Sequence, residues 1–169
     1  MPTMPTEPAP LDLPRQIALL RQANAMARDA RARGHHPFGA LLVAPDGQTV
    51  LLSQGNVDGV NHAEAVLARV AAHRYSREQL WACTLVTTFE PCAMCAGTQY
   101  WAHIGRLLYG ASEQRLRELT GDDPANPTLD LPCRHVFAAG RKPVQVIGPV
   151  PELDAELAEP HLGFWHPAS

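Results

Sequence analysis

The chain has 169 residues, of which 46% are hydrophobic and 18% are charged, and its formal net charge is −3. These values predict one globular domain with a buried core and exclude a disordered or low-complexity chain. The start carries Glu7 and Asp12 where a secretory signal has basic residues, and no run approaches the about 20 apolar residues of a membrane span. Cys83 and Cys133 lie in apolar runs typical of buried thiols. We therefore expect a cytoplasmic protein outside the membrane.

The spacing of apolar residues predicts alternating helices and strands. Residues 1–10 are rich in Pro and Thr and are expected to form a flexible arm. Asp12 can cap a helix that runs to about Arg33, where Gly34 would end it. The other expected elements are strands at 38–44 and 49–53, a helix at 62–73 capped by Asn61, a strand at 81–88, a helix opened by Pro91, a strand at 106–109, helices at 113–119 and 134–139, and a strand at 144–147.

This order of elements predicts an α/β fold, a three-layer sandwich with a mixed five-stranded sheet flanked by helices. Residues 11–150 would form the domain. The tail, 151–169, is acidic and contains neither Lys nor Arg. Near its end stand Phe164 and Trp165, and these two large aromatic side chains are expected to dock, because leaving them in water is unfavourable.

Two short motifs carry the clearest signal of chemistry. The first is the tripeptide His62-Ala63-Glu64, and the second, 28 positions after its acid, is Cys92-Ala93-Met94-Cys95 with Pro91 in front. One imidazole and two thiolates are ligands that zinc prefers, and three protein ligands leave a tetrahedral position open, as in catalytic sites. The two cysteines are three residues apart on a predicted helix, so they face the same side. Both motifs fall at predicted helix starts, where the helix dipole lowers a thiol pKa.

Glu64 follows His62 by two residues, a spacing that turns its carboxylate away from the face of the imidazole. It is a poor ligand, but it can reach a water at the metal and move its proton to a leaving group. Because two thiolates cancel the charge of the ion, the metal alone would acidify a water less than an all-histidine site does. Neither a closed structural zinc site nor a redox CxxC explains why His62 is accompanied by Glu64.

The pair H-x-E and P-C-x-x-C is the signature of the zinc deaminases. From about Pro37 to Gly148 the chain resembles the cytidine deaminase-like superfamily, and the stretch TFEPCAMCAG, residues 88–97, extends the likeness beyond the CxxC. Within the superfamily it resembles the branch of the guanine deaminases and tRNA adenosine deaminases. The resemblance implies a zinc cofactor on the imidazole and the two thiolates, the neighbouring acid as catalytic group, and release of ammonia from a small heterocycle.

The resemblance also implies contacts to the substrate from the strand side of the site. Phe38 stands in a PFGA segment similar to that of guanine deaminases, in which an aromatic ring lies against the base. A core position at a strand start is the alternative for this ring. Gly39 beside it would let backbone approach a ligand closely. Asn56 would place its amide on the base or, alternatively, form the turn after the second strand.

Further expected contacts come from the motifs themselves. Trp101 stands in a Tyr-Trp-Ala sequence similar to the guanine deaminases, with helix packing as the alternative, and Ala63 and Glu90 complete the set. One departure precedes the histidine. Val60-Asn61 replaces the usual Pro-Thr of guanine deaminases, and the interval between Asn56 and the histidine is several residues shorter. The pocket wall is therefore remodelled, and the base could differ from guanine.

Four functions remain open on the sequence alone. Deamination of a small free base, guanine-like first, is favoured, and the alternatives are a tRNA adenosine deaminase, a cytosine or nucleoside deaminase, and a non-catalytic zinc-binding module. Nucleic-acid binding is disfavoured because Lys142 is the only lysine and the tail is acidic. Arg28, Arg31 and Arg33 cluster at a helix end, where they complement the dipole. A homodimer is expected, and the tail is expected to form a lid or to staple to its own sheet.

Overall fold

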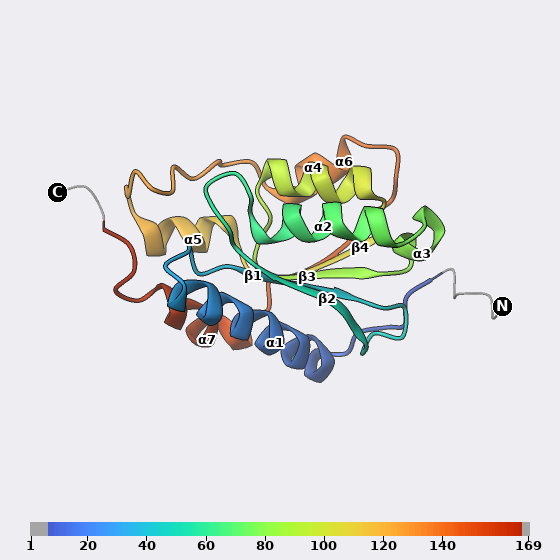
Figure 1. Ribbon diagram of the computed structural model, residues 1–169, viewed down its shortest axis with the longest axis horizontal. Coiled ribbons are helices and arrows are strands. Elements are labelled where there is room, and N and C mark those ends of the chain that lie inside the picture. The colour runs from blue at the N-terminus through green and yellow to red at the C-terminus, as the bar shows by residue number, and fades with distance from the viewer. Residues whose placement is uncertain (1–6, 167–169) are drawn as a thin grey trace.

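The computed structural model describes residues 7–166, and its middle layer is a five-stranded sheet (Figure 1). The strand order is β2-β1-β3-β4-β5. β1 (Gly39–Val43) pairs antiparallel with β2 (Val50–Gly55) and with β3 (Thr84–Phe89), whereas β3, β4 (Arg106–Ala111) and β5 (Gln145–Ile147) run parallel. The mixed five-stranded sheet predicted from the sequence is confirmed.

Helices cover both faces of this sheet (Figure 1). On one face lie α1 (Leu13–Ala32) and α7 (Asp154–Ala158), the latter between the 3₁₀ turns η1 (Pro151–Leu153) and η2 (Glu159–His161). The other face carries α2 (Ala63–Arg74), α4 (Ala93–Ala102) and α6 (Cys133–Ala138). The short helices α3 (Arg77–Trp81) and α5 (Glu113–Thr120) lie at opposite ends of the molecule. One hydrophobic cluster fills each interface between the sheet and a helical layer, so the three layers are confirmed.

Local chemistry sets the ends of α1 as expected. The Asp12 carboxylate accepts a hydrogen bond from the Arg15 backbone N–H at 2.9 Å, and Gly34 beyond the last turn takes φ +83°. A second close approach explains why position 39 is a glycine. A Cβ there would clash with the Ala23 carbonyl oxygen, so this glycine lets β1 pack closely against α1.

The expected strand at 81–88 is wrong at its start, because α3 ends at Trp81 and β3 begins only at Thr84. A capping box begins α3. The Gln79 backbone N–H donates to the Ser76 hydroxyl at 3.2 Å, and the Ser76 backbone N–H donates to the Gln79 side chain at 2.9 Å. The start of α2 also differs from expectation. Asn61 bonds to the Asp58 carboxylate through its backbone and side-chain N–H groups, so His62 occupies the N-cap position.

The tail is held against α1 by ionic contacts. Arg21 pairs with Glu156 at 2.8 Å and Arg28 with Glu159 at 3.1 Å, and Arg31 donates to the Pro160 carbonyl at 2.7 Å. The arginines of α1 therefore bind the acidic tail, a role beyond complementing the helix dipole.

At the other end of the chain, residues 1–6 of the expected arm lie outside the described part. Ala9 is anchored, because its N–H donates to the Pro45 carbonyl at 2.7 Å and its carbonyl accepts from Arg106 at 2.9 Å. Within residues 7–166, no helix is long and apolar enough to cross a membrane.

Candidate metal centre and active site

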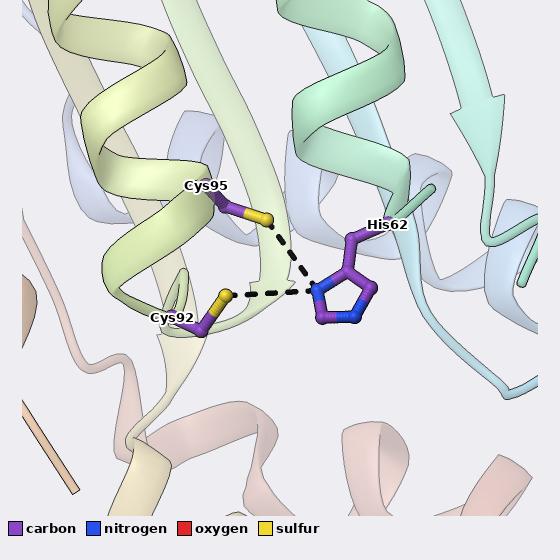
Figure 2. A group of neighbouring side chains, drawn as sticks. All are labelled: His62, Cys92 and Cys95. Carbon is purple, nitrogen blue, oxygen red and sulfur yellow. Dashed lines mark hydrogen bonds between the residues drawn. The ribbon is translucent and has the colours of Figure 1, made fainter. Parts of the chain in front are cut away.

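The two motifs meet at one edge of the sheet because α2 and α4 begin there. His62 is the N-cap of α2, Cys92 is the N-cap of α4, and Cys95 lies in the first turn of α4. α4 follows directly on β3, so its start lies at the carboxyl end of a parallel strand, where α/β sheets bind their ligands. The three side chains point toward one another (Figure 2).

The geometry of this cluster fits a zinc ion. The His62 Nδ1 atom lies 3.6 Å from the Cys92 Sγ and 3.5 Å from the Cys95 Sγ, and the three ligand atoms lie within 4.8 Å of one another. Zinc–sulfur and zinc–nitrogen bonds of about 2.3 and 2.0–2.1 Å at tetrahedral angles place such atoms about 3.6 Å apart. The donor set of one imidazole and two thiols therefore matches zinc in both chemistry and spacing.

A second hydrogen bond orients the imidazole. The His62 Nε2 atom lies 3.1 Å from the Gly59 carbonyl oxygen. With a metal bound, donation from Nε2 would leave the Nδ1 lone pair for the ion, and outer contacts of this kind fix the tautomer of metal-binding histidines. The Asp58 turn that holds Asn61 leads directly into this contact, so the loop before α2 serves the metal centre.

The thiols of the cluster differ in acidity. Hydrogen bonds from Cys95 and then from His62 lower the pKa of Cys92 to about 4, so this thiol is a thiolate at neutral pH. The pKa of Cys95 is raised because its thiol donates a hydrogen bond to the Cys92 thiolate. Cys83 and Cys133 are buried apart from the cluster, and burial raises their pKa to about 11 and about 12. They are the buried thiols expected from the sequence.

Glu64 lies beside the cluster without joining its ligand atoms. Its side chain is only 5% exposed, and the Thr87 hydroxyl donates a hydrogen bond to Oε1 at 2.7 Å. Burial is the largest cause that raises the pKa of this carboxyl above its usual range. The raised pKa makes it easier for this carboxyl group to hold a proton than for an exposed glutamate.

A cavity of about 280 Å³ opens in front of these residues. Three of the five expected substrate contacts, Phe38, Asn56 and Glu90, line it. Asn56 also closes a turn, since its Nδ2 atom donates to the Asp58 carbonyl at 3.1 Å. Ala63 is fully buried in the core cluster at the start of α2.

Trp101 does not reach the cavity in this chain. Its side chain is 80% exposed on the outer surface of α4, and the Lys142 ammonium lies 5.4 Å from its ring centroid. The whole of α4 is ten residues long, and Trp101 in its last turn follows Cys95 in its first turn, which faces the metal, by six positions. Trp101 therefore lies on the surface of this chain, away from the residues that line the cavity.

Several residues of the site had no signal strong enough to find from the sequence. They come from the end of β3, the start of α4, α5 and the loop before α6, and they are Phe89, Met94, Glu113, Leu116 and residues 125–129. For Glu113, burial, followed by the charges of Cys92 and Glu90, raises the pKa to about 8. An acid at the first position of a helix that follows a strand was the only hint in the sequence.

The end of the tail packs against the cavity wall. Trp165 donates from its indole N–H to His161 at 3.0 Å, and its ring lies 4.8 Å from that of His36. The His161 ring lies 5.2 Å from the ring of Phe38 and 4.7 Å from that of Phe89. The aromatic end of the tail therefore docks, as expected, on side chains that line the cavity.

A zinc-binding cluster with a buried acid beside it, at the sheet edge of a three-layer α/β sandwich, defines a zinc-dependent deaminase. The model of the cytidine and deoxycytidylate deaminase zinc-binding region matches residues 14–111. The chain belongs to this family and is a hydrolase that acts on C–N bonds in cyclic amidines.

Similar proteins are named for different bases. The chain is 37% identical over 155 residues to a Schizosaccharomyces pombe protein named "Probable cytosine deaminase", covering 89% of this chain and 93% of that protein. It is 38% identical over 91 residues to the guanine deaminase of Bacillus subtilis, covering 53% and 58%. A solved guanine deaminase from Nitrosomonas europaea, 20% identical, covers 95% of this chain and 88% of its own with a TM-score of 0.63.

Proposed function

We propose that the protein deaminates a small free base by hydrolysis, with cytosine as the first candidate. The observation that carries this choice is the similarity to the Schizosaccharomyces pombe protein, because 37% identity extends over 93% of that relative and well beyond the zinc-binding region. The departure at Val60-Asn61 supports a pocket that differs from that of guanine deaminases. Cytosine thus replaces guanine as the first substrate to test.

Guanine is the second candidate. The Bacillus subtilis guanine deaminase shares 38% identity over its matched region, although that region covers only 53% of this chain. Phe38, in the segment that resembles the PFGA of guanine deaminases, lines the cavity. These observations concern the residues around the metal, which bases of both sizes would meet.

Glu64 is the proposed proton-transfer group. A zinc ion bound by His62 and the two cysteines supplies Lewis acidity that favours loss of a proton from water. The Glu64 carboxylate accepts that proton as the water oxygen bonds to the amine-bearing carbon, and it then returns the proton to the amine nitrogen, which leaves as ammonia. Thr87 keeps the carboxyl aimed, since its hydroxyl donates to Oε1 at 2.7 Å. Phe38 and Phe89 supply apolar surface for a planar base.

The end of the tail is proposed to be a lid on this cavity. Its support is the contact of His161 with Phe38 and Phe89, two rings that line the cavity. The His166 backbone N–H also donates to the Asp123 carboxylate at 2.6 Å, which joins the tail to the loop whose residues 125–129 line the same cavity. Closing the site in this way excludes water and strengthens the electrostatic interactions inside it.

A panel of substrates tests the function. Zinc-loaded protein is incubated separately with cytosine, guanine, cytidine, adenosine and a tRNA, and ammonia and the deaminated products are measured. We expect cytosine to give the highest kcat/KM. Faster turnover of guanine would select the second candidate, and turnover of the tRNA alone would favour the activity of the tRNA-specific adenosine deaminase of Agrobacterium fabrum, which is 38% identical over 93 residues. If no ammonia is released from any of these substrates, the proposal is refuted.

A further inference from the structure

Glu113 brings a third carboxyl group to the cavity. It is the first residue of α5, directly after the carboxyl end of β4, and its side chain is 7% exposed. Its backbone N–H donates to the Glu90 carboxylate at 3.1 Å, which holds the start of α5 against the end of β3. The Glu113 side chain lines the same cavity as Glu64 and the metal cluster, without belonging to the group of ligand atoms.

The three glutamates of this cavity differ in what their carboxyl groups bind. Both Glu90 oxygens accept backbone N–H groups, from Glu113 at 3.1 Å and from Cys133 at 2.8 Å. Glu64 accepts from the Thr87 hydroxyl. Within residues 7–166, no hydrogen bond or ion pair involves the Glu113 carboxyl, and neither of its oxygens is sealed off as a fully buried atom. Glu113 therefore offers the cavity a carboxyl group that the fold does not use.

Burying such a carboxyl group is unfavourable for folding unless something binds to it. A largely buried polar group is less favourable without a hydrogen-bond partner than with one. Burial and then the negative charges of Cys92, Glu90 and Glu64 also disfavour the ionised form of the Glu113 carboxyl. Residues at sites that bind ligands tolerate this cost, because the ligand supplies the missing partner.

We propose that the Glu113 carboxyl accepts a hydrogen bond from a ring N–H of the substrate and thereby selects free bases over N-substituted bases and nucleosides. The inference rests on the proposed function. The amine that leaves must face Glu64 and the metal cluster, and the proposal places another edge of the planar base against Glu113, which lines the same cavity. In cytosine that edge carries N1–H, which a nucleoside replaces with a sugar. A carboxyl oxygen accepts a hydrogen bond whether or not the group is protonated.

Two substitutions test the proposal on a matched pair of substrates, cytosine and 1-methylcytosine, which differ at the N1 hydrogen. Glu113→Leu removes the acceptor and should lower kcat/KM for cytosine by about tenfold or more. The same variant should leave 1-methylcytosine within about twofold of wild type, because that substrate makes no such bond. Glu113→Gln keeps an acceptor oxygen and should retain most of the preference for cytosine. Gln114→Leu, at the exposed neighbouring position, is the control for effects on α5.

Binding of the product gives a second readout that does not depend on turnover. Calorimetry with uracil and 1-methyluracil should show the wild-type preference for uracil lost in Glu113→Leu and kept in Glu113→Gln. Equal losses for both members of each pair, or an unchanged preference in Glu113→Leu, would refute the role of Glu113 while leaving the deaminase function in place. Absence of turnover with every base of the panel would instead refute the proposed function. If guanine is the base that reacts, guanine and its ring N-methyl derivatives form the pair.

Discussion

At the scale of single residues, the assignment of Glu64 as the proton-transfer group rests on its burial beside the metal cluster and on its few partners. Its carboxyl is buried beside the metal cluster and has one side-chain partner, Thr87, at 2.7 Å. Gln has the same shape and can still accept that hydrogen bond, but it cannot take up or release a proton near neutral pH.

We therefore predict that Glu64→Gln keeps its zinc content and melting temperature and loses about 10²–10⁴-fold in kcat on the best base. Metal analysis, calorimetry and ammonia release measure the three quantities. Glu78→Gln changes an exposed glutamate and should behave as wild type. A Glu64→Gln variant that retained most of its turnover would show that another group carries the proton.

The metal cluster gives a second prediction at this scale. His62 begins α2, and Cys92 and Cys95 lie at the start of α4, so a bound ion cross-links the starts of these two neighbouring helices. Cys92→Ala should reduce the zinc content from about one ion per chain to a small fraction and should lower the melting temperature. Cys83→Ala, which removes a buried thiol outside the cluster, should keep its zinc. Equal zinc content in both variants would contradict the ligand assignment.

The sequence was sufficient for the residues whose chemistry is specific. An imidazole, two thiols and an acid at fixed spacings have few other uses, and the structure brings them together. It was insufficient for Trp101 and Glu113, because a side chain's surroundings depend on which way its helix is turned. Trp101 proved to lie on the outer surface, and Glu113, expected only to begin a helix, lines the cavity.

At the scale of elements, the buried strands and long helices were predictable because apolar residues in them follow clear periods. The short α3 was missed, although Ser76 and Gln79 form its capping box. The helical turns at 151–161 were missed as well. They are held by burial of Leu153 and Leu157 in the cluster that includes residues of α1, a long-range contact that no local pattern reveals.

The tail gives a prediction that separates a lid from a staple. Truncation after Leu162 removes Phe164 and Trp165 but keeps His161 and the contacts that Arg31 makes with the tail backbone. A lid predicts a loss of at least about tenfold in kcat/KM with a decrease of only a few degrees in melting temperature. A staple predicts a large decrease in melting temperature and unchanged kcat/KM at 20 °C. Trp165→Phe, which keeps an aromatic ring at this position, should lie close to wild type in both measurements.

His161 makes the stability of the tail depend on pH. Burial, more than the neighbouring charges of Arg31 and His36, lowers the pKa of this histidine to about 3, against about 6.5 in an unfolded chain. Between these values the unfolded chain binds a proton that the folded chain does not, so stability falls as pH falls below about 6.5. At pH 5 the loss is about 2 kcal/mol.

The His161→Gln variant isolates this effect. Gln cannot be protonated in this range and can still accept the hydrogen bond from the Trp165 indole. We predict that the stability difference between pH 7.5 and pH 5, measured by urea unfolding, is smaller in His161→Gln than in wild type by about 2 kcal/mol. Carboxylates titrate in both proteins and cancel in the comparison. Equal pH dependence of the two proteins would mean that His161 is protonated in the folded state.

At the scale of the whole molecule, the fold places two different surfaces on α4. The first turn faces the metal, while its outer side forms a groove with α2 that is lined by small and apolar residues and ends at Trp101. In the described part of the chain, Trp101 is the most exposed of the large hydrophobic side chains, at 80%. Exposed apolar surface of this kind marks protein interfaces. A second copy of the chain is the occupant expected from the sequence resemblance, and this groove is where we place the contact.

The prediction is that the protein is a dimer in solution and that Trp101→Glu makes it a monomer. A charge at the centre of an apolar contact would be buried without a partner, which typically weakens association by several kcal/mol. Light scattering after size exclusion measures the mass over a range of concentrations. Leu13→Glu places the same charge on an exposed leucine at the start of α1, on the opposite face of the sheet, and should remain dimeric. A wild-type protein that stays monomeric at high concentration, or a dimer that tolerates Trp101→Glu, would contradict the placement of the interface on α2 and α4.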